Sequence, residues 1–128
     1  MSNIDKSWYN NLAKSKLTPP DFVFPIVWTI LYMMIIASFI VYLLGNKTNI
    51  GFIFFGIQMV LNLIWSPVFF RMKNIKLSLM IIILMWAFIL ITIIVFYQTN
   101  PLSSYLLIPY FIWVSLATYL NIFIFIYN

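Results

Sequence analysis

The sequence predicts an all-α integral membrane protein that crosses the bilayer as a bundle of four transmembrane helices. Hydrophobic residues make up 65% of its 128 residues and charged residues only 7%. In a soluble domain, roughly a quarter of the residues are charged. The few charges also leave long uncharged stretches between them, and one crossing needs about 20 apolar residues. A soluble domain, a disordered chain and an ordinary nucleic-acid-binding protein are therefore excluded.

Residues 1–21 predict a polar leader at the membrane interface. They carry two aspartates, three lysines and no continuous apolar run, so we do not expect a signal peptide. Trp8 and Tyr9 are of the residue types that favour the headgroup level of a bilayer, and the leader ends in Thr18-Pro19-Pro20. We expect this leader to lie over the mouth of a bundle formed by residues 22–128.

The first two spans follow from the gaps between charges. Asp21 and Lys47 bracket 25 uncharged residues, and Lys47 and Arg71 bracket 23. At about 1.5 Å of rise per residue, each gap fits the hydrocarbon thickness of a bilayer. We place these two helices near residues 22–44 and 49–70.

The last two spans share the uncharged end of the chain. The 52 residues after Lys76 carry no charge and are too many for one crossing. A polar run at residues 98–101 interrupts them and ends in Pro101, which is suited to the first position of a helix. Pro109 should kink the final helix because proline lacks the backbone N–H. We place these helices near residues 77–97 and 102–127.

The basic residues predict the orientation. On a path of four helices, Lys47 alone falls on one side of the membrane and six basic residues fall on the other. Because cytoplasmic loops carry an excess of Lys and Arg, we expect both termini in the cytoplasm and a location in a bacterial cell membrane. The six residues are Lys6, Lys14, Lys16, Arg71, Lys73 and Lys76.

Ordinary catalytic and metal chemistry is not available to this chain. It has no His and no Cys, and its acids, Asp5 and Asp21, lie outside or at the edge of the expected spans. No nucleophile–base pair, carboxylate pair or usual transition-metal site can be assembled inside the membrane. We therefore expect no metal, no resident cofactor and no certain catalytic residue.

Amides and small residues form two polar helix faces. Gln58 and Asn62 lie one helical turn apart, and Trp113, Ala117 and Asn121 repeat that spacing in the last span. Both faces should point into the bundle. Such amides can simply join helices through interhelical hydrogen bonds, or they can supply the polar groups of a ligand pocket.

Tryptophans beside these faces favour the pocket. Trp28 with Tyr32 one turn later, and Trp65 next to the amide face, can form flat walls for a planar apolar ligand. Trp86 lies midway along a span with no polar neighbour in the sequence. We expect Trp86 to face lipid or core and not the pocket.

Three ordered motifs resemble those of the tryptophan-rich sensory protein and translocator protein family (TspO/MBR). The resemblance covers about residues 8–128 and is specific, because all three motifs occur in family order and spacing. The motifs are Trp8-Tyr9 with Thr18-Pro19-Pro20 and Phe24-Pro25-x-x-Trp28-Thr29-x-Leu31-Tyr32; Gln58-x-x-x-Leu61-Asn62-x-x-Trp65-Ser66; and Leu107-x-Pro109-Tyr110-x-x-Trp113-x-x-x-Ala117-x-x-Leu120-Asn121.

The resemblance implies a receptor or sensor-type membrane protein, commonly a homodimer, that binds porphyrins and other planar hydrophobic molecules between its helices. Some bacterial members of the family degrade protoporphyrin in light, which would make Trp28 and Trp113 the catalytic candidates. The family normally has five transmembrane helices, so we expect this chain to lack the first. The ligand-binding residues carried over from the family are Tyr9, Pro19, Pro20, Trp28, Tyr32, Asn62, Trp65, Trp113, Ala117 and Asn121.

The sequence is also compatible with two other classes of membrane protein. A small four-helix multidrug exporter fits the length and the helix count, although proton coupling usually needs a carboxylate inside the membrane. A purely structural subunit also fits, and failure to bind any ligand would distinguish it. Light-dependent protoporphyrin breakdown is the one enzymatic activity that the sequence leaves open.

Overall fold

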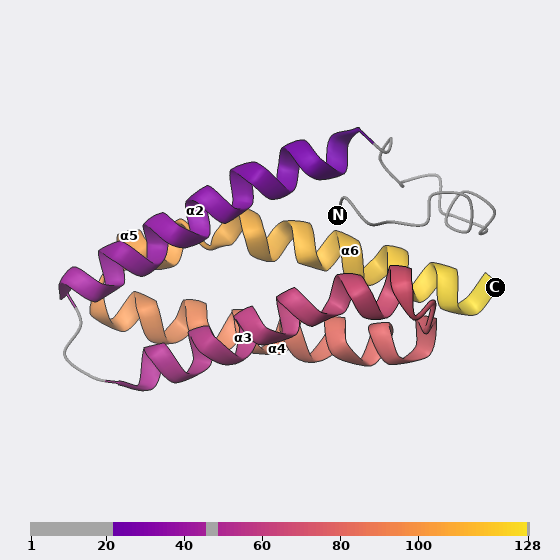
Figure 1. Ribbon diagram of the computed structural model, residues 1–128. Coiled ribbons are helices and arrows are strands. Elements are labelled where there is room, and N and C mark those ends of the chain that lie inside the picture. The colour runs from indigo at the N-terminus through magenta and orange to yellow at the C-terminus, as the bar shows by residue number, and fades with distance from the viewer. Residues whose placement is uncertain (1–21, 46–48, 128) are drawn as a thin grey trace.

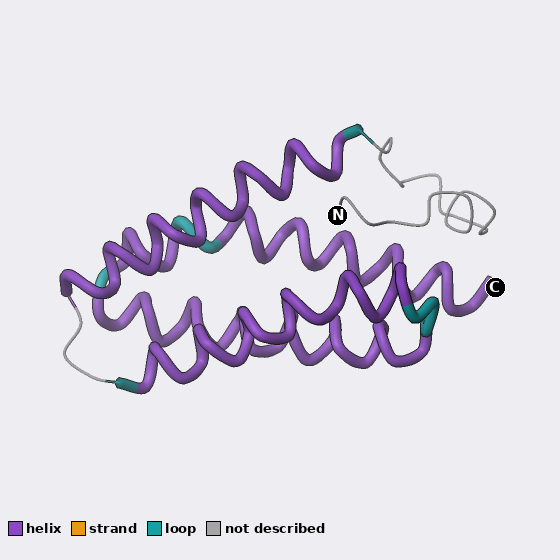
Figure 2. Tube along the Cα trace, in the orientation of Figure 1, coloured by secondary structure: helices purple, strands orange, loops and turns teal. Residues whose placement is uncertain are grey.

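The computed structural model describes residues 22–45 and 49–127, which form helices joined by short turns (Figure 1). Four of its helical stretches are long and apolar enough to cross a membrane, and Figure 2 shows no strand in this part of the chain. The predicted all-α, four-span fold is confirmed. The elements are α2 (Val23–Gly45), α3 (Ile50–Ser66), η1 (Pro67–Arg71), α4 (Ile75–Thr99), α5 (Pro101–Tyr105) and α6 (Ile108–Tyr127).

Side-chain caps set the bounds of the third span. The side chain of Asn74 accepts a hydrogen bond from the backbone N–H of Leu77 at 3.0 Å, and α4 therefore begins at Ile75. At the other end Asn100 accepts from the N–H of Leu102 at 3.0 Å, and it separates α4 from α5. The span runs two residues further at each end than the predicted 77–97. At its start the Asn74 cap, and not the last charge, sets the first residue, and at its end the helix continues until Asn100, whose backbone is extended.

Proline changes the helix geometry at two places. Pro67 opens η1, a π-helical turn in which the N–H of Met72 reaches the carbonyl of Pro67 at 3.0 Å. In the last span, Pro109 cannot donate a backbone hydrogen bond, and the helix breaks at residues 106–107. The continuous helix expected over residues 102–127 is therefore two helices, α5 and α6.

The helices pack as a bundle with two different ends. α3 runs beside α4, and α6 packs on α4, while α2 lies closest to α5 and diverges from the other helices toward Val23 (Figure 1). We call the end where α2 finishes and α5 begins the Gly45 end (residues 38–45, 50–55 and 92–107). The opposite end is the Arg71 end (residues 22–32, 58–78 and 110–127).

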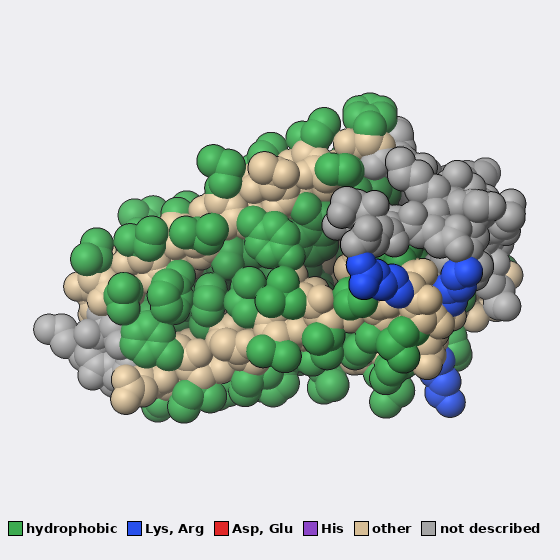
Figure 3. Space-filling model, viewed as in Figure 1, with side chains coloured by type: hydrophobic (Ala, Val, Ile, Leu, Met, Phe, Trp, Pro, Cys, Tyr) green, Lys and Arg blue, Asp and Glu red, His purple; other side chains and the backbone are tan. Residues whose placement is uncertain are grey.

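The outer surface is apolar, as a lipid-facing surface should be. Hydrophobic side chains cover the visible face of the bundle (Figure 3), and many Ile, Leu and Met side chains are exposed. Lys and Arg side chains gather at one end of that face, and among the described residues they are Arg71, Lys73 and Lys76. The leader, Lys47 and the predicted positions of Tyr9, Pro19 and Pro20 lie outside the described residues.

Candidate ligand-binding site

An aromatic cluster joins α2 and α6 at the Arg71 end. The ring of Trp28 lies 5.6 Å from that of Tyr32, 6.4 Å from that of Tyr110 and 6.4 Å from that of Trp113, measured between centroids. The two indoles are nearly perpendicular, at 89°, and Phe24 meets Trp113 edge-on at 5.7 Å. This arrangement places three of the predicted site residues, Trp28, Tyr32 and Trp113, in one cluster.

A chain of hydrogen bonds connects the same helices to α3. The Tyr32 hydroxyl donates to Oδ1 of Asn62 at 2.5 Å, and Nδ2 of Asn62 donates to the Tyr110 hydroxyl at 2.7 Å. The Tyr110 hydroxyl in turn donates to Oε1 of Gln58 at 2.7 Å. In the membrane interior, where water does not compete, these bonds hold α2, α3 and α6 in one register.

A second polar group lies further toward the Arg71 end. The indole Nε1 of Trp65 donates to Oδ1 of Asn121 at 3.0 Å, and the hydroxyl of Ser78 lies 3.4 Å from the same oxygen. Trp65 stacks on Phe69 with centroids 5.3 Å apart and meets Phe70 edge-on. Asn121 thus links α3, α4 and α6 beside an aromatic cluster.

The structure brings most of the predicted site residues into two neighbouring groups. Ala117 is half-buried and packs on the core, on the α6 face between the two groups. Tyr9, Pro19 and Pro20 fall outside the described residues. The aromatic group contains Trp28, Tyr32, Asn62 and Trp113, and the second group contains Trp65 and Asn121.

Sequence reasoning did not single out two residues that the site depends on. Tyr110 is fully buried and forms the centre of the hydrogen-bond chain, and the signal was its position three residues before Trp113, on the same helix face. Ser78 is fully buried against Asn121. No pattern in its own helix marks it, because its partner comes from a distant helix.

Trp86 lies apart from this site. Its ring is on the outer side of α4, 36% exposed, and packs 5.1 Å from the ring of Phe111. No polar residue lies beside Trp86 along α4, and its Nε1 donates instead to the hydroxyl of Ser115 at 2.8 Å. Ser115 comes from α6, so the neighbour could not be seen along α4.

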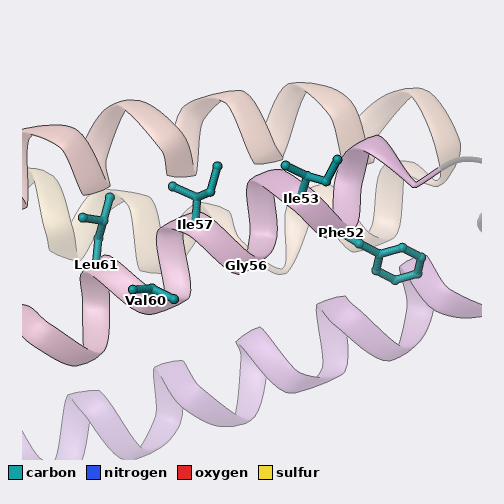
Figure 4. Close-up of a pocket in the computed structure, with 6 residues that line it drawn as sticks. All are labelled: Phe52, Ile53, Gly56, Ile57, Val60 and Leu61. Carbon is teal, nitrogen blue, oxygen red and sulfur yellow. The ribbon is translucent and has the colours of Figure 1, made fainter.

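An apolar hollow of about 450 Å³ lies along α3 (Figure 4). A Cβ built at Gly56 would meet no atom within 4 Å, so this part of the helix faces open space. The hollow offers no hydrogen-bonding side chain and therefore little specificity for a polar ligand. Its lining residues are Phe52, Ile53, Gly56, Ile57, Val60 and Leu61.

Comparison with known proteins agrees with the motifs. The model of the TspO/MBR family matches residues 1–127. The chain belongs to the TspO/MBR family. The resemblance on which the sequence analysis relied is confirmed, and the protein is a multi-span integral membrane protein of this family.

Curated relatives come from bacteria, an archaeon and animals. The tryptophan-rich protein TspO of Chlorobaculum tepidum is 43% identical over 121 residues, which cover 90% of this chain and 76% of the relative. The tryptophan-rich sensory protein of Cereibacter sphaeroides is 38% identical, over 89% of this chain and 72% of the relative. The translocator protein of Homo sapiens is 34% identical, over 89% of this chain and 70% of the relative.

Proposed function

We propose that this TspO/MBR protein binds planar hydrophobic ligands, porphyrins above all, between α2, α3 and α6. The observation that carries the proposal is the cluster in which Trp28 meets Trp113 at right angles beside the buried amides of Gln58 and Asn62. Apolar walls with a few convergent polar groups are the usual composition of a small-molecule site. The family resemblance supports porphyrins as the ligand class.

The packing of α2 supports ligand entry at the Arg71 end. This half of α2 is held by aromatic contacts of Trp28 and by the bond from Tyr32 to Asn62. The other half packs on α5 through the bond from the Ser38 hydroxyl to the carbonyl of Ser103. A flat aromatic ligand can replace ring contacts on α2 without disturbing the Gly45 end.

Light-dependent breakdown of bound protoporphyrin is the activity that this site would support. The porphyrin absorbs the light, and the indoles of Trp28 and Trp113, whose rings lie 6.4 Å apart, are groups of the site that, besides the phenols, can donate an electron. The protein would hold and shield the ligand, and the reactivity would belong to the porphyrin.

The proposal extends to orientation and assembly. The exposed cations at the Arg71 end support a cytoplasmic location for that end, and with it for both termini in a bacterial cell membrane. A homodimer would cover part of the apolar outer surface. Single cysteines at Ser2 and Asn128 should resist an impermeant thiol reagent in intact cells, and the molar mass in mild detergent should be that of two chains.

Titration of the purified protein with protoporphyrin tests the binding. We expect saturable quenching of tryptophan emission at micromolar ligand, equivalent to about −8 kcal/mol. Absorbance of the complex in light and in darkness then measures breakdown. A structural subunit would show no saturable binding. A proton-coupled exporter would need an intramembrane carboxylate, and the described spans contain none.

A further inference from the structure

The turn between η1 and α4 gathers positive charge at the edge of an apolar surface. Arg71 is the last residue of η1 and Lys76 is the second residue of α4, and both side chains are exposed. No Asp or Glu occurs among residues 22–45 and 49–127, so neither cation has a side-chain carboxylate partner in that part of the chain. Figure 3 shows cations at the end of a face that is otherwise covered by hydrophobic side chains.

Lys76 lies where the helix itself repels a cation. The N-terminus of a helix carries partial positive charge, so acidic residues stabilise the first turn and basic residues destabilise it. The first turn of α4 contains Lys76 and no acidic residue. A negatively charged group beside Lys76 would offset this repulsion.

Backbone hydrogen bonds fix the shape of this turn. Lys73 has a φ of 54°, in the left-handed region that glycine adopts most easily. The N–H of Asn74 donates to the carbonyl of Val68 at 3.1 Å, and the N–H of Met72 donates to that of Pro67 at 3.0 Å. The positions of the cations on the turn are therefore set by the main chain and do not depend on contacts of their own side chains.

An apolar stripe on α4 begins at Lys76. Met80, Ile83 and Leu84 follow it at four, seven and eight residues, a spacing that places them on the same face of the helix, and all three are exposed. The rise from Lys76 to Leu84 is about 12 Å, close to the roughly 15 Å that one leaflet contributes to the hydrocarbon core. A molecule that meets both the cations and the stripe must join an anionic head to a long apolar chain.

We propose that this turn binds an anionic phospholipid, with Arg71 and Lys76 at the headgroup phosphate and an acyl chain along the stripe of Met80, Ile83 and Leu84. The site is separate from the aromatic cluster, so the proposal is independent of porphyrin binding. Near a membrane surface, each Lys or Arg strengthens the attraction of anionic lipid about fivefold. Arg71 and Lys76 together should therefore favour an anionic over a zwitterionic lipid more than about tenfold.

Two lipids with the same acyl chains test the proposal. Dioleoylphosphatidylglycerol has a net negative headgroup, and dioleoylphosphatidylcholine has a zwitterionic one. Added to the purified full chain in mild detergent, phosphatidylglycerol should be retained more than about tenfold over phosphatidylcholine in native mass spectrometry. It should also raise the thermal midpoint about 3 °C more than phosphatidylcholine does.

Single charge removals assign the preference to residues. Arg71→Gln and Lys76→Gln should each lower the preference for phosphatidylglycerol about fivefold. Without added lipid, Lys76→Gln should be at least as stable as the wild type, because it removes a cation from the positive end of α4. A loss of lipid preference without a loss of stability is a result that a merely structural role of Lys76 would not give.

Lys47→Gln is the matched control. It removes one positive charge from another part of the chain, so it should leave the preference unchanged. Glycerol phosphate supplies the anionic group without acyl chains, and it should not raise the thermal midpoint at the concentration at which the lipid does.

The proposal is overturned if the two lipids are retained equally, or if Lys47→Gln lowers the preference as much as Lys76→Gln does. The first result would show that the turn does not recognise charge, and the second that only the net charge of the chain matters. An equal effect of glycerol phosphate would identify a soluble anion as the ligand in place of a lipid. A lower thermal midpoint of Lys76→Gln without lipid would show that Lys76 serves the fold.

Discussion

The two ends of the bundle solve the problem of burying polar and aromatic groups in different ways. At the Gly45 end, Tyr42 stacks flat on Phe96, with centroids 4.0 Å apart at 8°, and Phe55 lies parallel to the same ring. The Ser38 hydroxyl donates to the carbonyl of Ser103 at 2.5 Å. At this end the rings pack on one another, and the Ser38 hydroxyl has a backbone acceptor.

By contrast, buried amide and indole donors at the Arg71 end are left without acceptors. Trp28 and Trp113 are perpendicular, and all three of the unpaired buried side-chain atoms found among the described residues belong to this end. Each such atom costs about 1–3 kcal/mol of stability. The packing at the Gly45 end therefore stabilises the fold. The unpaired donors at the Arg71 end lower the stability of the free protein, and a bound ligand could pair with them.

The largest effect should come from filling the space beside the indoles. Ala117→Phe puts a ring one helical turn beyond Trp113, where we place the ligand. We expect protoporphyrin affinity to fall more than about 100-fold, or about 3 kcal/mol, measured by quenching of tryptophan emission. The unfolding temperature should change much less, because Ala117 is only half-buried. Normal porphyrin binding by this variant would place the pocket elsewhere.

A substitution at the Gly45 end should have the opposite effect, lowering stability and leaving porphyrin binding unchanged. A Cβ at Gly51 would overlap the phenol of Tyr42, which is fully buried against Phe96. Gly51→Ala should therefore lower the free energy of unfolding by about 1–3 kcal/mol through overpacking, seen as a lower thermal midpoint in detergent, while the protein that stays folded binds porphyrin normally.

Gly56→Ala is the control for that substitution. It makes the same change in the same helix, at a position where a Cβ meets nothing within 4 Å. Its thermal midpoint should equal or exceed that of the wild type. Equal losses in the two variants would show that glycine itself, and not the contact with Tyr42, matters in α3.

Tyr110→Phe sharpens the comparison by removing only a hydroxyl. The donor of Asn62 and the oxygen of Gln58 would both lose their partner, so we expect a loss of about 1–2 kcal/mol in stability. Porphyrin should recover part of this loss, and the shift of the thermal midpoint on adding ligand should be larger than in the wild type. A variant as stable as the wild type would show that the hydrogen-bond chain does not hold the helices together.

Trp28→Phe should have the smallest effect on binding. Phenylalanine keeps an aromatic face and loses area and the N–H, so affinity should fall roughly threefold, or less than about 1 kcal/mol. Breakdown of protoporphyrin in light should fall much more steeply, because one of the two readily oxidised indoles is gone. Trp86→Phe should alter neither quantity, and an equal effect there would remove the special role of Trp28.

The number of spans was predictable from the sequence because charge is too costly to place at random in a membrane protein. The gaps between charges, together with the polar run at residues 98–101 that divides the uncharged end of the chain, were enough to predict four crossings. The inward direction of Gln58 and Asn62 was predictable for the same physical reason, since lipid cannot pair an amide.

The partners of these groups were not predictable. Which residue of α6 meets Asn62 depends on the break at residues 106–107, which sets where α6 begins and hence the register of Tyr110. Ser78 and Ser115 have partners only through packing between α4 and α6. Periodicity along one helix predicts which face is buried but not what that face touches.

The π-helical turn at Pro67–Arg71 is a place where the chain should tolerate the loss of one residue. A π turn holds about one residue more than an α turn, and it lies after Trp65, beyond the residues of α3 that make the site. We expect the loss of one residue there to convert the turn to α geometry and leave the site intact. The same deletion between Gln58 and Trp65 would rotate one half of α3 by about 100° against the other and separate the amide of Gln58 from Tyr110.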